Sequence, residues 1–323
     1  SVDVVPFLFD DYLFRLYQTK RRSLAAVVAA YFRRIAFLLR RGQYDIIWLE
    51  KEVIPYMPFW MECLLLGNGA PIVVDYDDAI YHTYDLSPLW PVRTLLRGKI
   101  PSIMAHASVV TTGNEYIAEF ARNAGAKRIE IIPTCVDLTR YLPSAHRQDE
   151  EFRIGWIGTP SSFRYLEHVI EPIRRFCGER RAELLIIGTE EMRMPDVPFR
   201  VVPWSEEDET RHLSEIDVGI MPLIDEPWAH GKCGYKIVQY MAASKPVIVS
   251  PSPANNSMLE GSGAGVIARS DDDWYNALNM LYEDPVRARE MGMRGYKEVE
   301  TKYVYDVVAT DLADIMISLT RSA

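Results

Sequence analysis

The sequence alternates between short apolar runs and longer segments in which apolar residues recur every three or four positions. Short runs rich in Val and Ile are typical of strands that are buried on both faces of a sheet. The longer segments have the spacing of amphipathic helices. The predicted strands lie at residues 2–8, 44–50, 71–76, 107–112, 128–133, 152–158, 182–188, 199–204, 217–223, 246–250 and 263–268.

Helical patterns separate most of these strands, which is the signature of a doubly wound parallel sheet. The alternation pauses at the polar stretch "SAHRQDEE" (144–151) and then begins again. We therefore expect two similar α/β domains, residues 1–143 and 144–302, that face each other across a cleft. The tail after Asp271 is almost all helical in pattern, and we expect its last helix, about residues 303–323, to pack back on the first domain.

Composition and charge narrow the functional classes. The chain has 323 residues, of which 48% are apolar, and a formal net charge of -9. This is enough material for two hydrophobic cores, and the acidic balance argues against nucleic-acid binding. The four cysteines are far apart, which excludes a local zinc knuckle, gives no disulfide framework and favours a reducing cytoplasm. No apolar run reaches the roughly 20 residues that cross a bilayer.

Residues 20–43 differ from the rest of the chain, because they carry seven cations and no carboxylate. Their apolar positions recur at spacings of three and four, which predicts a basic amphipathic helix. Such a helix either lies on an anionic membrane surface or packs against a sheet with its basic face in solvent. The sequence leaves both interpretations open. The apolar stripe consists of Leu24, Val27, Val28, Tyr31, Ile35, Leu38 and Leu39.

Ligands of parallel sheets bind where strands end in loops that lead into helix N-termini. The first such turn, "IGTPSSFR", runs from Gly158 through Thr159, Pro160 and Ser161 to Arg164. Small hydroxyls and free helix N–H groups can bind an anion here, and the arginine adds positive charge. A strand–turn–helix connection without any ligand uses the same residue types, so this turn alone does not decide between the two.

A second helix start carries two lysines, Lys232 and Lys236, on either side of Gly234 and Tyr235. The N-terminus of a helix already has partial positive charge, so exposed cations there are mildly unfavourable. A bound anion such as a diphosphate would account for them, with the backbone N–H groups sharing in its binding. The alternative is that one or both lysines extend into solvent.

A third strand end, "VVDYDDAIYH", presents Asp75, Asp77 and Asp78, with His82 close behind. Carboxylates at this place suit base catalysis, hydroxyl recognition or metal binding. Asp pairs also form ordinary turns, and a lone histidine is more often structural than catalytic.

Three motifs carry a family resemblance: "IIPTCVD" (131–137), "SEIDVGIMPL" (214–223) and "GKCGYKIVQYMAASKPVIVS" (231–250). They resemble the I-P-N-G-V-D, A-D-V-x-x-x-P-S and E-x-F-G-x-x-x-L-E-A-M-A-x-G-x-P-V-I runs of retaining glycosyltransferases of family 4. The resemblance extends in order over nearly the whole chain. It implies an α/β chain of GT-B fold, in which the first Rossmann-like domain lies on the acceptor side and the second binds a nucleotide-sugar donor.

The resemblance also implies roles for residues around the second helix start. Gly234, Tyr235 and Lys236 fall on the family's phosphate-contacting loop, and Gln239 falls on the Glu that usually binds the ribose. Gly231 falls on the Glu that usually contacts the donor sugar, so we expect that contact to be missing or replaced. The candidate replacements are Asp225, Glu226 and Lys232.

Other positions depart from the family pattern. Thr159 replaces the usual Arg of the first turn, and Arg164 lies near the place of the usual Lys. Asp77 falls at the position of a His that family members present to the reacting sugar, and Asp78 follows as the common Asp. Ser244 replaces the Gly expected at the end of the helix.

The resemblance implies transfer of a sugar from a nucleoside diphosphate sugar to the hydroxyl of a saccharide or lipid-linked acceptor. We expect retention at the anomeric carbon, no metal and no cofactor, in cell-surface polysaccharide or glycolipid synthesis. A catalytically inactive binding or scaffold protein and a sugar-nucleotide epimerase are the alternatives. The expected catalytic residues are Asp77, Asp78 and Lys236, and the expected donor-binding residues are Gly158, Thr159, Pro160, Ser161, Arg164, Gly188, Trp204, Lys232, Cys233, Gly234, Tyr235, Lys236 and Gln239.

The first residues, "SVDVVPFLF", include no initial Met and no signal peptide, and they resemble the family's second strand. We therefore expect the first strand and its glycine-rich loop, about 30 residues, to be missing, which would weaken or abolish activity. The expected location is the cytoplasm, with peripheral attachment to the inner face of the membrane through residues 20–43.

Overall fold

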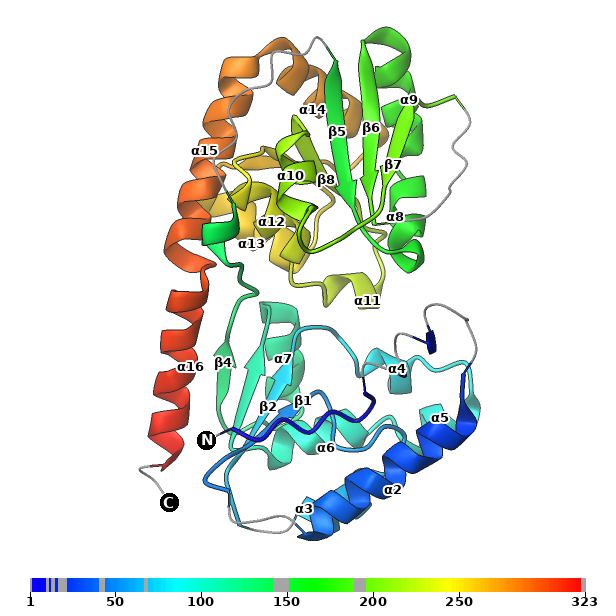
Figure 1. The fold of residues 1–323 in the computed structure, drawn as a ribbon, viewed down its shortest axis with the longest axis vertical. Helices are drawn as coiled ribbons and strands as arrows, with labels where there is room; N and C mark the ends of the chain where they lie inside the picture. The colour runs from blue at the N-terminus through cyan, green and yellow to red at the C-terminus, as the bar shows by residue number, and fades with distance from the viewer. Residues whose placement is uncertain are drawn as a thin grey trace.

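The structure, a computed structural model, describes residues 2–9, 12, 15–16, 22–40, 44–66, 69–141, 151–188 and 196–320. They form two α/β domains, each built around one parallel sheet (Figure 1). The C-terminal helices run along one side of both domains. The doubly wound architecture predicted from the alternating pattern is confirmed.

The first domain has a parallel sheet of strand order β1-β2-β3-β4. Helices α3, α6 and α7 cover one face of this sheet, and their apolar side chains pack on alternate residues of β2 and β3. The elements are α2 (Leu24–Arg40), β1 (Ile47–Glu50), α3 (Phe59–Leu66), β2 (Ile72–Tyr76), α4 (His82–Asp85), α5 (Trp90–Leu95), α6 (Lys99–His106), β3 (Val109–Thr112), α7 (Glu115–Asn123), β4 (Ile129–Ile131) and the 3-10 turn η1 (Leu138–Arg140).

The last helix, α16 (Tyr305–Thr320), packs on the other face of the first sheet (Figure 1). Ile315 fills the space between Val73 and Val109. The side chain of Arg128 donates a hydrogen bond to the hydroxyl of Ser318 over 2.7 Å. The chain therefore completes its first domain with residues that follow its second.

The two chain crossings between the domains lie next to each other. Val136 and Val304 form an isolated parallel bridge, and the N–H of Val136 donates to the carbonyl of Tyr303 over 2.9 Å. One crossing follows β4, and the other joins α15 to α16.

The second domain has a six-stranded parallel sheet of order β10-β9-β8-β5-β6-β7. The order in which the chain adds strands to this sheet reverses between β5 and β8, which pair in parallel. Its elements are β5 (Phe152–Ile157), η2 (Pro160–Ser162), α8 (Phe163–Glu167), α9 (Ile170–Glu179), β6 (Ala182–Ile187), β7 (Phe199–Val202), α10 (Glu209–Ser214), β8 (Val218–Met221), α11 (Pro227–His230), α12 (Tyr235–Ala242), β9 (Val247–Val249), α13 (Pro253–Ser262), β10 (Gly265–Ile267), α14 (Asp271–Glu283) and α15 (Pro285–Lys302).

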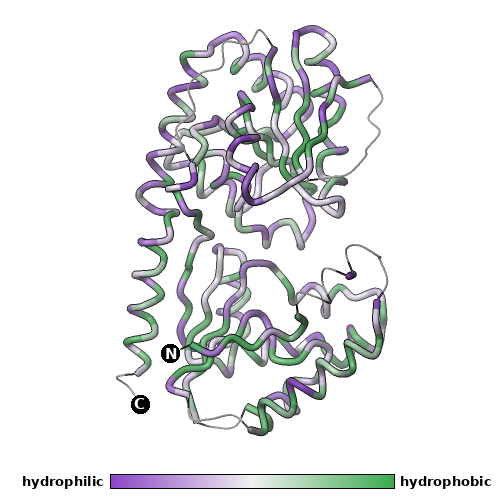
Figure 2. The backbone as a smooth tube through the Cα atoms, viewed as in Figure 1, coloured by the Kyte–Doolittle hydropathy of each residue, from purple (hydrophilic) through white to green (hydrophobic). Residues whose placement is uncertain are grey.

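Both faces of the second sheet are buried. Helices α8, α9 and α14 pack on one face, and α12, α13 and α15 pack on the other. Figure 2 shows the strands as continuous apolar segments, as expected for a parallel sheet covered on two sides. A crevice at the point where strand order reverses is the usual ligand site of such a sheet.

The strand predicted at residues 2–8 is not formed, because residues 2–9 belong to no strand. The carbonyls of Val5 and Phe7 accept hydrogen bonds from the side chains of Arg34 and Arg33, each over 2.8 Å. Pro6 has no N–H to donate to a sheet. The segment is therefore held by α2 instead of by a neighbouring strand.

The helical segment between β5 and β6 is divided into α8, which ends at Glu167, and α9, which begins at Ile170. Pro172 explains the break, since its ring has no N–H and collides with the carbonyl four residues earlier in a continuous helix. Residues 144–150 of the predicted polar linker lie outside the described residues.

Helix α2 has two apolar faces. Tyr31, Ile35 and Leu38 pack on the core of the first domain. Leu24 and Phe32 are 77% and 70% exposed. Packing on the sheet therefore leaves part of the apolar stripe uncovered, so the two interpretations of residues 20–43 do not exclude each other. No helix in the described part of the chain is long and apolar enough to span a bilayer.

A buried ion cluster joins the loop after β1 to α6. The ammonium group of Lys99 lies 2.5 Å from a carboxylate oxygen of Glu52 and 3.0 Å from one of Glu62, and it donates to the carbonyl of Ile54. Lys99 and Glu62 are fully buried, and burial raises the pKa of Glu62 against the opposing effect of Lys99. The cluster fixes the loop that leads from the sheet to α3.

Replacing Lys99 with Met should lower the free energy of unfolding by about 3–5 kcal/mol at neutral pH, because it leaves two buried carboxylates without a cation. Urea-induced unfolding measures this loss, which should shrink as the pH falls and the carboxylates bind protons. The matched control is Lys127→Met at an exposed site, with an effect within about 0.5 kcal/mol. Equal losses in the two variants would show that the cluster contributes nothing.

Candidate functional site

A pocket of about 340 Å³ lies at the carboxyl ends of β5, β6 and β7, beside the first turn of α12. This is the place where the strand order of the second sheet reverses. Among residues expected to bind the donor, the structure brings together those that end these strands and those that begin α12. The pocket is lined by Ile157, Gly158, Thr159, Gly188, Trp204, Glu209, Tyr235, Lys236 and Gln239.

Two glycines allow the strand ends to approach each other. Gly188 has φ +99°, which favours glycine, and a Cβ there would lie 2.7 Å from the carbonyl oxygen of Gly158. A Cβ at Gly158 would in turn lie 2.5 Å from the ring of Trp156. The close approach of these turns forms the floor of the pocket.

Helix α12 begins with an uncapped turn. Gly234 adopts a left-handed conformation at φ +75°, and no side chain accepts a hydrogen bond from the first-turn N–H groups. A Cβ at Gly234 would lie 2.7 Å from the sulfur of Met258. The positive end of the helix macrodipole is therefore open toward the pocket.

Lys236 is half-buried in this first turn, with its ammonium group 4.7 Å from the ring centroid of Trp156. Within the described part of the chain, no carboxylate pairs with it. Burial, together with the charge of Lys232, lowers the pKa of Lys236 to about 8. Burial and a neighbouring cation thus disfavour the positive charge of Lys236, and a bound anion would stabilise it.

The pocket is also lined by a buried carboxylate that the sequence did not reveal. Glu209 accepts hydrogen bonds from the indole of Trp204 over 2.6 Å and from the hydroxyl of Tyr141 over 2.9 Å. Gln239 is hydrogen-bonded to the same tyrosine. Glu209 comes from the stretch "SEEDET", which has the pattern of a solvated acidic turn, and only the fold shows that one of its acids is buried.

The loop before α12 packs directly on the first domain. A Cβ at Gly231 would overlap Ala79, whose backbone nitrogen would lie 2.7 Å away. The amide of Asn114 donates to the carbonyls of Gly231 and Lys232 over 3.1 and 3.2 Å. Glycine is thus required at 231 for close approach, because a side chain does not fit against Ala79.

The next two residues of this loop, Lys232 and Cys233, also contact the first domain. Lys232 pairs with Asp78 over 3.0 Å, and the thiol of Cys233 donates to the carbonyl of Asp77 over 2.8 Å. The side chain of Asp77 pairs with Lys51 over 3.1 Å. Burial and the nearby aspartates raise the pKa of Cys233 to about 12, so its thiol stays protonated. All four cysteines are free.

The remaining residues expected to bind phosphate or sugar have partners outside the pocket. Arg164 pairs with Glu226, which also accepts from Tyr165, and Asp225 pairs with His230 over 2.7 Å. The charged side chains that the sequence suggested as ligand contacts are therefore paired with other protein groups. The predicted site residues that do not line the pocket are Pro160, Ser161, Arg164, Lys232, Cys233, Gly234, Asp77 and Asp78.

His82 is satisfied structurally, by Asp85 over 2.9 Å and by the hydroxyl of Tyr116 over 3.1 Å. No group of three or more His, Cys, Asp or Glu side chains is placed to hold a metal ion, as far as the described residues go.

Solved structures with the same fold include enzymes of sugar transfer. Sucrose-phosphate synthase from Thermosynechococcus elongatus matches with a TM-score of 0.71 at 18% identity, over 96% of this chain and 80% of that one. Anabaena Alr3699/HepE in complex with UDP-glucose matches with a TM-score of 0.70 at 14% identity, over 97% and 90%. Trehalose-6-phosphate synthase, from a study of glycosyltransfer with retention, matches with a TM-score of 0.65 at 12% identity, over 95% and 84%.

Two family models match the two domains in turn. Residues 10–140 match "Glycosyltransferase Family 4", and residues 151–284 match "Glycosyl transferases group 1". The chain is a glycosyltransferase of the GT-B fold. No curated protein matches this glycosyltransferase in sequence. The predicted GT-B fold is confirmed, and the pocket lies in the domain that matches the group 1 model.

Replacing Gly231 with Ala should push the loop of this glycosyltransferase away from Ala79 and lower the free energy of unfolding by about 1–3 kcal/mol. The second substitution Ala79→Gly removes the overlap with the Ala79 Cβ but not the approach to its backbone nitrogen, so it should recover part of the loss, which a double-mutant cycle measures by urea unfolding. Gly178→Ala is the matched control, since nothing lies within 4 Å of a Cβ at that helical position. Additive losses in the cycle would contradict the close contact.

Proposed function

We propose that the pocket binds the nucleoside diphosphate part of a sugar nucleotide, and that the protein transfers the sugar to an acceptor hydroxyl with retention. The observation that carries this proposal is Lys236, a half-buried cation at the uncapped start of α12 with which no carboxylate of the described residues pairs. A diphosphate supplies the missing anion to both the lysine and the helix. The UDP-glucose complex of HepE and the retention studied in trehalose-6-phosphate synthase support the proposal by analogy of fold.

In the proposed reaction, charge develops on the diphosphate as the bond to the anomeric carbon breaks. Lys236 and the N–H groups of the first turn of α12 stabilise this charge, so the reaction needs no metal and no cofactor. Lys232 lies near enough to Lys236 to lower its pKa, and it is the second cation of the site once it leaves Asp78. Asp77 and Asp78 come from the first domain to this edge of the site and contact the sugar or the incoming hydroxyl.

Replacing Lys236 with Gln should weaken UDP binding by about 10- to 100-fold, because a charge-assisted contact to phosphate is lost. The wild type should also take up about half a proton per UDP at pH 8, since the anion raises a pKa that starts near 8 while the phosphate is already ionised. Isothermal titration in buffers of different ionisation enthalpy measures both quantities.

In the same titrations, Lys127→Gln at an exposed site is the control and should bind as the wild type does. The diphosphate assignment is wrong if neither UDP nor GDP binds the wild type, or if Lys236→Gln keeps full affinity and the same proton uptake.

A thermal-shift screen across nucleotide sugars identifies the donor, because a ligand that binds the folded state raises the unfolding temperature. NMR of the product with that donor and a saccharide acceptor then reads the anomeric configuration directly. Inversion would overturn retention. A donor changed without any acceptor indicates an epimerase, and a donor that binds without turnover indicates a binding or scaffold protein.

For the acceptor we propose a saccharide or lipid-linked hydroxyl at an anionic membrane surface, as in cell-surface polysaccharide or glycolipid synthesis on its cytoplasmic side. Support comes from the exposed apolar side chains of two neighbouring helices, α2 and α3, on the first domain. Arg22, Arg33 and Arg34 add positive charge beside them in a chain of net charge -9. The most exposed apolar residues of these two helices are Leu24, Phe32, Leu39, Trp60 and Leu64.

The double variant Leu24→Glu/Phe32→Glu should bind vesicles containing phosphatidylglycerol at least about tenfold more weakly than the wild type, since each buried apolar side chain contributes about 1.5–3 kcal/mol. Vesicle sedimentation at low and high salt measures the effect. Val286→Glu, at a 63% exposed position on the second domain, is the control. Equal binding by all three proteins, or no preference of the wild type for anionic over neutral vesicles, would rule out this surface.

A further inference from the structure

The pocket that contains Lys236 is also lined by a carboxylate. Glu209 is the one acidic side chain among the described residues that line the pocket, and it is 4% exposed. It accepts one hydrogen bond on each oxygen, from Trp204 and from Tyr141. A carboxylate has about four acceptor positions, so two remain for a ligand.

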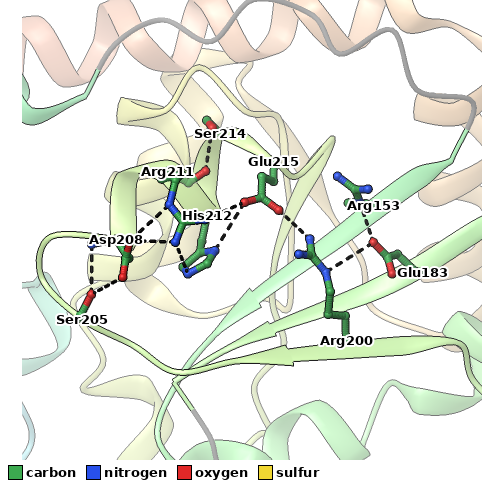
Figure 3. Close-up of polar contacts among 9 residues, drawn as sticks. All are labelled: Arg153, Glu183, Arg200, Ser205, Asp208, Arg211, His212, Ser214 and Glu215. Carbon is green, nitrogen blue, oxygen red and sulfur yellow. Dashed lines mark hydrogen bonds and ion pairs between the residues drawn. The ribbon is translucent and has the colours of Figure 1, made fainter.

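A chain of charges holds the helix that carries this carboxylate. Figure 3 shows Arg200 of β7 between Glu215, at the end of α10, and Glu183 of β6, with Arg153 of β5 on the far side. The side chain of Asp208 accepts from Ser205 and Arg211 at the other end of the helix (Figure 3). Burial raises the pKa of Glu215, but its hydrogen bond to Arg200 and the nearby positive charges, that of Arg200 first among them, together outweigh burial and lower the pKa. Both ends of α10 are thus anchored independently of the pocket.

Tyr141 links Glu209 to Gln239. The tyrosine has one proton, which it donates to Glu209 over 2.9 Å. The group at 239 must then donate to the tyrosine oxygen, and the amide of Gln239, which is hydrogen-bonded to Tyr141, has the N–H groups to do so. A carboxylate at 239 has no proton to give at neutral pH, so Glu209 and a Glu at 239 would compete for the same hydroxyl. The pair of an acid at 209 and an amide at 239 satisfies every partner.

We infer that Glu209 is the residue that recognises the ribose of the bound nucleotide, by accepting hydrogen bonds from its hydroxyls. This inference rests on the proposed function, because it places the diphosphate at Lys236 and the nucleoside in the rest of the pocket. Ribose presents two adjacent hydroxyl donors, and a carboxylate accepts both with charge-assisted hydrogen bonds. A buried acceptor left unpaired by a missing hydroxyl discriminates strongly against the deoxy analogue.

The test compares UDP with 2′-deoxy-UDP by isothermal titration. The wild type should prefer UDP by about tenfold or more, and Glu209→Gln should reduce this preference to near one. Gln239→Glu should weaken UDP binding at neutral pH, and the exchange variant Glu209→Gln/Gln239→Glu should recover it in part, because one acid and one amide again share Tyr141. Glu207→Gln, at an exposed neighbouring position, is the matched control.

The ratio of the affinities for UDP and 2′-deoxy-UDP separates ribose recognition by Glu209 from a role of Glu209 in positioning its neighbours. If Glu209 only holds Trp204 in place, its replacement lowers the affinity for UDP and 2′-deoxy-UDP by the same factor, which overturns the inference. If Glu209→Gln leaves the ratio of affinities unchanged while UDP binding still depends on Lys236, the ribose inference is wrong and the proposed function stands. Failure of the wild type to bind either ligand overturns the proposed function instead. Thermal unfolding of each variant shows whether it is folded, and Gln239→Glu keeps the test open if Glu209→Gln is not.

Discussion

At Gly231 the second domain comes so close to the backbone of Ala79 that no side chain fits between them. This contact fixes the distance between the two sheets at the edge where their carboxyl ends meet. It also sets the start of α12, because the loop that touches the first domain leads directly into the helix beside the pocket. The pairs of Lys232 with Asp78 and of Cys233 with the backbone of Asp77 follow from the same approach. The close fit of the loop before α12 against the first domain therefore depends on this glycine.

Charge is distributed unevenly around this contact. Most cations at the domain edge have carboxylate partners, such as Lys51 with Asp77 and Arg164 with Glu226. Lys236 is different, since its ammonium group lies over an aromatic ring at the start of a helix and no carboxylate of the described residues pairs with it. In the lining of the same pocket, Glu209 is an anion that accepts hydrogen bonds from neutral donors. The described lining thus combines one cation and one anion, each with its own set of neighbours.

The strands and the doubly wound order were predictable because Val and Ile runs record burial on both faces of a strand. Residues 2–8 have the same composition but form no strand, since their carbonyls are bound by Arg33 and Arg34 from a helix further along the chain. Strand-end glycines and the lysines of α12 were also predictable from position. The pairing of Arg164 with Glu226 was not, because the partners are far apart in sequence. The burial of Glu209 could not be predicted either, because its partner Tyr141 is far away in sequence. The reason for a glycine at 231 in place of the family's Glu is the contact with Ala79, which is also distant in sequence. The spacing of apolar residues in α2 could not distinguish its buried face from its exposed apolar face, because both faces have apolar residues three and four positions apart.

The bridge between Val136 and Val304 has a mechanical consequence. Both chain crossings between the domains pass through this one point, and a backbone hydrogen bond from Val136 to Tyr303 ties them together. Two strands fastened side by side resist stretching and shear but still allow bending. A change in the angle between the domains would therefore bend the chain at this bridge, and it would also have to separate Gly231 from Ala79.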